Sequence, residues 1–152
     1  MVLSDTIYHK QETKYTCGEA CLIMFYNKIN IKKTESQLTK KLKPSYVYGT
    51  TQQKLNNFAK KQKFYYTSKG NSTIKELKKL LKEDCFIIVN YLIEEENEGH
   101  YSVVKDITKT KIIFFDPYLG KNFSLLIKKF EKLWNMVGRK NNENKWFIAL
   151  KK

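Results

Sequence analysis

The chain has 152 residues, of which 41% are hydrophobic and 14% aromatic, and its 29 basic and 15 acidic residues give a net charge of +14. This apolar content suffices for a packed core, and it excludes a disordered chain or a Gly/Pro-rich linker. The longest apolar runs, such as residues 86–89, fall far short of the roughly 20 residues that span a bilayer. We therefore expect residues 1–152 to form a single domain with no membrane span.

The first half of the chain is predicted to be mainly helical. A helix over residues 16–29 begins with Thr16-x-x-Glu19, the pattern of a capping box. Apolar residues surround most of this helix, so it should be largely buried. Three further helices are expected over residues 34–42, over residues 51–61 and from Thr73 onward.

The second half is predicted to form strands over residues 85–92, 101–107, 111–115 and 146–150. A short polar turn joins the second and third of these strands, which indicates a hairpin. Residues 116–120 should form a turn, and a helical segment that contains Phe130 and Trp134 precedes the last strand. Helices followed by strands are typical of an α+β fold, in which N-terminal helices pack on a C-terminal antiparallel sheet.

The positive charge comes almost entirely from lysine, because Arg139 is the only arginine. Base readout and phosphate clamping favour the rigid fork of arginine. The lysines are scattered between apolar positions, as on a solvated surface. We expect no specific nucleic-acid partner, although nonspecific binding to phosphate backbones stays open.

The cysteines and the N-terminus indicate a reducing compartment. Three cysteines cannot all pair within one chain, and Cys21 and Cys85 lie in apolar stretches typical of ordinary buried residues. The first residues lack the cationic and apolar regions of a secretory signal. A cytoplasmic location is therefore expected.

Cys17 is the candidate nucleophile. It is the first residue of the predicted buried helix, where unpaired backbone N–H groups and the positive end of the helix dipole favour a thiolate. Gly18 has no side chain and lets another chain approach the sulfur. The alternative reading of Cys17 is a small core residue at a helix start.

A thiolate nucleophile needs an imidazole to hold the ion pair and to protonate the leaving amine. His100 begins a strand directly after Gly99, whereas His9 lies in the N-terminal arm. Asp116 ends the partner strand of the predicted hairpin, so the register should place it beside His100. An aspartate at this strand end can orient the imidazole ring.

Gln11 lies six residues before Cys17. Its amide, together with the backbone N–H of Cys17, can form an oxyanion hole. The four glutamates within residues 94–98 can attract a basic substrate segment, but this stretch is expected to form a solvated loop and not a metal site. No metal or cofactor is expected.

Taken together, these motifs resemble the papain-like clan and, within it, the C39 family of bacteriocin-processing peptidases. The matching residues are Gln11-x5-Cys17-Gly18-x-Ala20-Cys21-Leu22, Gly99-His100-Tyr101-x-Val103-Val104, Asp116-Pro117-x-x-Gly120 and Phe130-x3-Trp134. The resemblance implies a papain-like fold with nucleophile Cys17, general acid/base His100, orienting residue Asp116 and oxyanion donor Gln11. Thr16 replaces the aspartate that often precedes the cysteine in this family.

The resemblance also implies a peptide or protein substrate that is hydrolysed through a thioacyl intermediate. Well-known members are domains of ABC exporters that cleave leader peptides after Gly-Gly. This chain has no GxxxxGK[ST] motif, so an exporter would act in trans unless the chain is part of a longer protein. A narrow cleft would suit two glycines, with Tyr46, Val47 and Tyr48 as one wall. The alternatives are a catalytically silent module that binds peptide or nucleic acid, and an acyltransferase or isopeptidase on the same fold.

Overall fold

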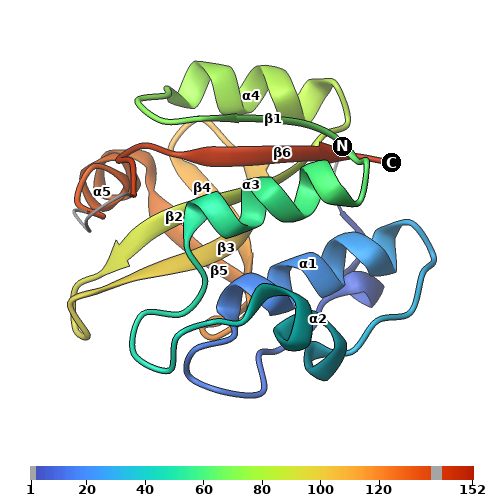
Figure 1. Ribbon diagram of the computed structural model, residues 1–152. Coiled ribbons are helices and arrows are strands. Elements are labelled where there is room, and N and C mark those ends of the chain that lie inside the picture. The colour runs from blue at the N-terminus through green and yellow to red at the C-terminus, as the bar shows by residue number, and fades with distance from the viewer. Residues whose placement is uncertain (1–2, 138–141) are drawn as a thin grey trace.

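The computed structural model describes residues 3–137 and 142–152, so Arg139 lies outside the described residues. An antiparallel six-stranded sheet, with strand order β1-β6-β2-β3-β4-β5, runs through the molecule (Figure 1). The strands are β1 (Tyr65–Lys69), β2 (Phe86–Ile93), β3 (Glu98–Ile107), β4 (Lys111–Asp116), β5 (Gly120–Leu126) and β6 (Phe147–Lys151). The four predicted strands correspond to β2, β3, β4 and β6, and the two edge strands were not predicted.

The helices are η1 (Asp5–Ile7), α1 (Cys17–Lys28), α2 (Glu35–Leu42), α3 (Gln52–Lys61), α4 (Ile74–Lys82) and α5 (Ile127–Trp134). The predicted helices are therefore confirmed. At the start of α2, the Thr34 hydroxyl accepts a bond from the Gln37 backbone N–H, and the Gln37 side chain accepts one from the Thr34 N–H. This reciprocal pair is a complete capping box.

The capping box predicted for α1 is wrong. Thr16 makes no side-chain cap bond, and its hydroxyl pairs instead with the hydroxyl of Thr13 at 2.8 Å. The Glu19 carboxylate turns into the interior, where it accepts a 2.5 Å bond from the Thr50 hydroxyl. The rest of the prediction holds, because every residue of α1 from Cys17 to Tyr26 is buried.

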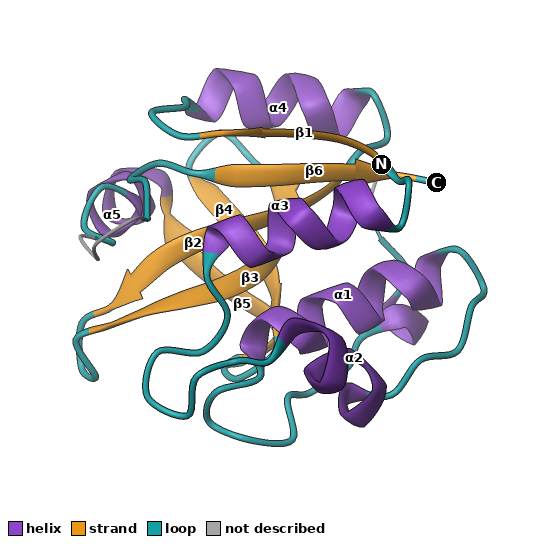
Figure 2. Cartoon of the chain, viewed as in Figure 1, coloured by secondary structure: helices purple, strands orange, loops and turns teal. Residues whose placement is uncertain are grey.

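Two apolar cores cover the two faces of the sheet (Figure 2). Helices α1, α2 and α3 pack on one face, against residues such as Phe86 and Ile88 of β2. Helices α4 and α5 pack on the other face, against the alternate residues Ile87 and Val89. Strand β2 is thus buried on both sides, in keeping with its apolar sequence, which only Asn90 interrupts.

The hairpin of β3 and β4 brings separate parts of the chain together. Val103 pairs with Phe115. If the register continues by one residue, Asp116 lies opposite Ser102. Ser102 and His100 are two residues apart on β3, so their side chains point to the same face of the sheet, and Asp116 lies diagonally across from His100.

None of the helices in the described parts of the chain is long and apolar enough to cross a membrane.

Candidate active site

The structure places Cys17, His100 and Gln11 around one surface pocket. We call it the Cys17 pocket; it is lined by Gln11, Lys14, Tyr15, Cys17, Val47, Tyr48, Gly49, Ile93, Glu96, Glu98, Gly99, His100 and Tyr118. Cys17 opens helix α1, and its side chain is mostly buried, with 7% of the residue exposed. His100 comes from β3, and Gln11 comes from the N-terminal arm. Three separate segments therefore meet at the thiol.

His100 and Asp116 form a buried pair behind the pocket. The imidazole Nε2 lies 2.8 Å from Asp116 Oδ1, and both side chains are almost inaccessible to solvent. The adjacency predicted from the hairpin is thus present, as a diagonal contact between neighbouring strands. The bond uses Nε2, which leaves Nδ1 as the ring nitrogen available to another partner.

The electrostatic environment favours a protonated imidazole. Burial alone would lower the pKa of His100, but the charges of Asp116 and Cys17, and hydrogen bonds to both, raise that pKa to about 10. Burial also opposes ionisation of Asp116, but His100 and a hydrogen bond from Tyr91 lower the pKa of the carboxyl below its usual value. Both members of the pair are therefore charged near neutral pH.

Hydrogen bonds hold the Asp116 carboxylate from several directions. Its Oδ1 accepts bonds from the backbone N–H groups of Tyr118 and Leu119, at 2.9 and 2.8 Å. Its Oδ2 accepts a 2.6 Å bond from the Tyr91 hydroxyl. The Tyr8 hydroxyl donates to the Asp116 backbone carbonyl at 2.7 Å. The carboxylate is therefore fixed in place before any substrate binds.

Tyr91 is a site residue that the sequence analysis missed. It pairs with His100 across β2 and β3, and the two rings meet edge to face with centroids 5.8 Å apart. Its hydroxyl reaches over to Asp116 on the next strand. The available signal is a tyrosine within a largely apolar strand, because a buried hydroxyl normally requires a hydrogen-bond partner.

Gln11 lies at the pocket as predicted, and the structure defines its present contacts. Its backbone N–H donates to the Pro117 carbonyl at 2.9 Å, which ties the N-terminal arm to the turn after Asp116. Its side-chain Nε2 donates to the Thr13 carbonyl at 2.7 Å, and its buried Oε1 has no hydrogen-bond partner. The amide has a second N–H in addition to the one given to Thr13.

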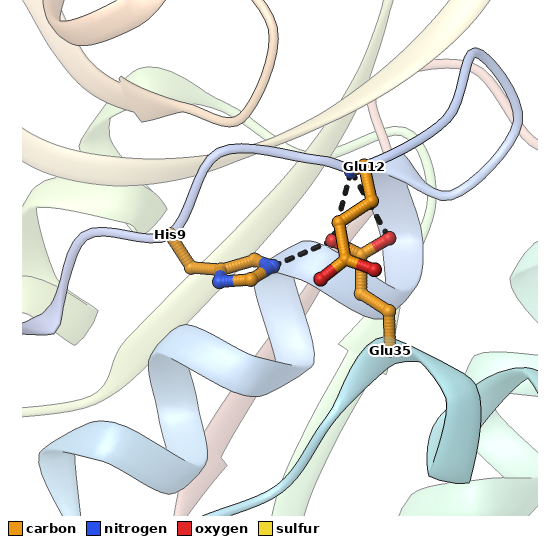
Figure 3. Close-up of side chains that lie close together, drawn as sticks. All are labelled: His9, Glu12 and Glu35. Atoms are coloured by element: carbon orange, nitrogen blue, oxygen red, sulfur yellow. Dashed lines mark hydrogen bonds and ion pairs between the residues drawn. The ribbon is translucent and has the colours of Figure 1, made fainter.

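Glu35 anchors the arm on both sides of Gln11 (Figure 3). Its buried carboxylate accepts a bond from the Glu12 backbone N–H at 3.0 Å and lies 2.5 Å from His9 Nε2. Within the described ranges, His9, Glu12 and Glu35 also form the group that could hold a metal ion, with ligand atoms within 4.8 Å of one another. The bonds to Glu35 give this cluster a structural role in holding the arm.

One wall of the pocket comes from the segment between α2 and α3. Val47, Tyr48 and Gly49 line the pocket, whereas Tyr46 does not. The Tyr46 ring lies edge-on against Tyr15, with centroids 4.9 Å apart, and Tyr15 does line the pocket. Gly49 has a φ of +70°, and a Cβ there would lie 3.2 Å from the Tyr15 carbonyl oxygen, so this turn favours glycine.

A buried network connects this wall to helix α1. The Thr50 hydroxyl donates to Glu19, and the Tyr101 hydroxyl donates to the Thr50 carbonyl at 2.7 Å. Burial raises the pKa of Glu19, and Glu19 Oε1 has no partner. Glu19 therefore fixes the position of the wall relative to Cys17, a role that the sequence analysis did not assign to it.

The other two cysteines differ from Cys17. Cys21 is fully buried, as predicted, and burial and neighbouring negative charges raise its pKa. Cys85 is only partly buried, which corrects the prediction of an ordinary core residue. The pKa of the Cys85 thiol is also raised, chiefly by burial. Within the described residues, neither is among those that line the Cys17 pocket.

The model of the peptidase C39 family matches residues 5–148. The chain belongs to the peptidase C39 family. This membership and the fold support a cysteine peptidase at the level of the family. No curated protein shows a significant match to the chain.

Solved structures share the fold of this C39 family member. A C39-like peptidase from Bacillus anthracis has a TM-score of 0.80 at 16% identity, with 99% of this chain and 96% of that chain covered. The peptidase domain of Streptococcus ComA, a bifunctional ABC transporter of a quorum-sensing pathway, has a TM-score of 0.70 at 22% identity, with 94% and 96% covered. The same domain of Streptococcus mutans ComA, in complex with a small-molecule inhibitor, has a TM-score of 0.62 at 19% identity, with 95% and 98% covered.

Proposed function

We propose that the protein is a cysteine peptidase in which Cys17 is the nucleophile, His100 the general acid and base, and Asp116 the residue that orients the imidazole. The observation that carries the proposal is the buried His100–Asp116 pair, which adjoins a pocket lined by both His100 and Cys17. Such a pair supplies the proton that an amide leaving group needs. The raised pKa of His100 keeps that proton in place at neutral pH.

The proposed reaction has two steps. The Cys17 thiolate attacks the substrate carbonyl carbon, the C–N bond breaks, and the His100 imidazolium gives its proton to the departing amine. A water molecule then attacks the thioacyl carbon while His100 takes up a proton, which releases the carboxylic acid and restores Cys17. Asp116 stays ionised throughout and keeps the ring in position.

Two donors are proposed for the oxyanion of the tetrahedral intermediates. The first is the backbone N–H of Cys17, at the start of α1, where helical N–H groups have no intrahelical partner. The second is the side-chain amide of Gln11, through the N–H that Thr13 does not take. The Glu35 anchor supports this role because it holds the arm on both sides of Gln11.

The substrate is proposed to be a peptide cleaved after Gly-Gly, as in the leader-peptide processing of bacteriocins. Support comes from family membership and from the pocket wall of Val47, Tyr48 and Gly49, whose turn packs tightly against Tyr15. Tyr46 extends this wall outward through its contact with Tyr15. We further propose that an ABC exporter acts with this chain in trans and that processing takes place in the cytoplasm, where the three free cysteines would stay reduced.

The test compares peptides that carry Gly-Gly, Gly-Ala or Ala-Gly at one junction, with cleavage followed by mass spectrometry. The proposal predicts cleavage of the Gly-Gly peptide alone and none by Cys17→Ala. Equal cleavage of all three would support the peptidase and reject the Gly-Gly specificity. Transfer of the acyl group to an added amine without hydrolysis would indicate the acyltransferase alternative, and no turnover would indicate a binding module.

A further inference from the structure

Three side chains of types that commonly bind metal ions meet beside the N-terminal arm. We call them the His9 cluster: one ring nitrogen of His9 and one carboxylate oxygen of each of Glu12 and Glu35 lie within 4.8 Å of one another. His9 and Glu12 come from the arm, and Glu35 is the first residue of α2. In Figure 3 both side chains of the arm turn toward Glu35. Glu35 follows Glu12 by 23 residues, so no local spacing indicates the cluster, and the sequence analysis expects no metal.

The two carboxylates of the His9 cluster have no lysine partner. Within the described residues, every ion pair that a lysine makes uses another acidic residue, although the chain has 29 basic residues. Glu35 is almost fully buried, with 2% exposed, and two carboxylates at this separation repel each other. A cation bound between them would neutralise this charge.

The charge of Glu35 also acts on groups outside the cluster. Burial is the largest cause of the raised pKa of Glu19 and of Cys21, and the negative charge of Glu35 adds to both shifts. This observation is independent of the distances within the cluster. It indicates a local excess of negative charge in a protein whose net charge is +14.

We propose that His9, Glu12 and Glu35 bind one divalent transition-metal ion of the Zn²⁺ type. An imidazole combined with carboxylates suits Zn²⁺, whereas Mg²⁺ prefers oxygen ligands alone. Glu35 is a ligand fixed on a helix, and the partly exposed His9 and the exposed Glu12 can adjust to the ion. His9 Nε2 and Glu35 Oε2 lie 2.5 Å apart and would separate to about 3.3 Å, the spacing of two ligands in a tetrahedral zinc site. Water would complete the coordination on the exposed side.

A bound ion would clamp the arm that carries Gln11. His9 and Glu12 lie on either side of Gln11, and the arm is held to Glu35 by the His9 ring and by the Glu12 backbone N–H. The ion would add the Glu12 carboxylate to these contacts and tie both sides of Gln11 to α2. The backbone N–H groups of residues 9–12 should therefore exchange with solvent more slowly when zinc is bound.

The test is a calorimetric titration of Cys17→Ala protein with zinc chloride, because this variant lacks the thiol that would compete for zinc beside His100. We expect one ion per chain. Glu12→Gln removes a ligand but keeps the backbone bond to Glu35, so it should leave the arm in place and weaken zinc binding at least tenfold. No saturable zinc binding, or an unchanged affinity in Glu12→Gln, would overturn the proposal.

Glu83→Gln is the matched control. Glu83 is an exposed glutamate at the end of α4, on the other face of the sheet, and its substitution makes the same change in charge. Zinc affinity should stay that of the Cys17→Ala parent. An equal loss in the two glutamine variants would mean that zinc senses only the net charge, and would reject the site.

Two further measurements identify the ion and its place. Magnesium chloride should not compete with zinc, and magnesium binding as tight as that of zinc would exclude an imidazole ligand. Hydrogen exchange with and without zinc should show slower exchange at the Glu12 N–H in the parent but not in Glu12→Gln. Exchange that zinc does not change would place the ion elsewhere. Neither measurement uses turnover, so the outcome does not depend on the proposed peptidase activity.

Discussion

Tyr91 lies directly opposite His100 in the sheet, and its hydroxyl donates to Asp116 on the following strand. Three neighbouring strands thus each contribute one member of a buried chain of hydrogen-bonding side chains. The arrangement holds the Asp116 carboxylate between a tyrosine hydroxyl and an imidazole. It accounts for a histidine that stays protonated although it is almost fully buried.

The first prediction concerns the pH dependence of turnover. Because the pKa of His100 is raised to about 10, kcat/KM should stay high into the alkaline range and fall as His100 loses its proton. In Asp116→Asn the larger of the two charges that raise this pKa is gone, so the alkaline limb should move to lower pH and kcat should drop. Profiles of kcat/KM against pH for both proteins measure this. An unchanged alkaline limb in the variant would mean that Asp116 does not raise the pKa of His100.

The second prediction concerns stability. A raised His100 pKa stabilises the fold fully below the unfolded value of about 6.5, and this stabilisation is lost as the pH rises through the folded value of about 10. A lowered Asp116 pKa stabilises the fold above about 3.8, and this is lost as the pH falls through the folded value. The Tm difference between wild type and His100→Gln/Asp116→Asn should therefore be largest near pH 4 to 6.5 and shrink toward pH 10. A Tm difference that does not change with pH would contradict a charged His100–Asp116 pair in the folded protein.

The third prediction concerns Tyr91. Tyr91→Phe removes the hydroxyl that donates to Asp116 and should raise the pKa of that carboxyl. We expect kcat to fall several-fold with a stability loss of about 1 kcal/mol. Tyr26→Phe, another buried tyrosine but on helix α1, is the control and should keep full activity. Equal activity in the two variants would leave Tyr91 with a packing role alone.

The helices could be predicted from the sequence because their apolar spacing and threonine starts are local signals. Strands β1 and β5 could not, since each is an edge strand in which every residue is exposed or only partly buried, so neither carries a buried apolar pattern. The position of Asp116 beside His100 followed from one hairpin. The roles of Tyr91 and Glu35 depend on partners 25 and 26 residues away, which no local pattern reveals.

The fourth prediction concerns Gln11. Gln11→Ala should lower kcat by roughly a hundredfold with little change in KM, because the lost donor would act on the oxyanion and not on the bound substrate. Gln11→Glu keeps the shape of the side chain but places a negative charge near the developing oxyanion, so it should be at least as damaging. Steady-state kinetics of both variants provide the measurement. Full activity in Gln11→Ala would leave the Cys17 backbone N–H as the one proposed donor.

The most direct test of the account is the relative rate at which iodoacetamide labels the three cysteines of the folded protein near neutral pH. Cys85 is the more exposed thiol and Cys17 the more buried, so accessibility alone predicts that Cys85 reacts first. An activated nucleophile beside His100 predicts the reverse: brief labelling followed by peptide mass mapping should find Cys17 modified well before Cys85 or Cys21. The preference should disappear in His100→Ala. Faster labelling of Cys85 in the wild type, or an unchanged Cys17 rate in His100→Ala, would contradict a Cys17–His100 catalytic pair.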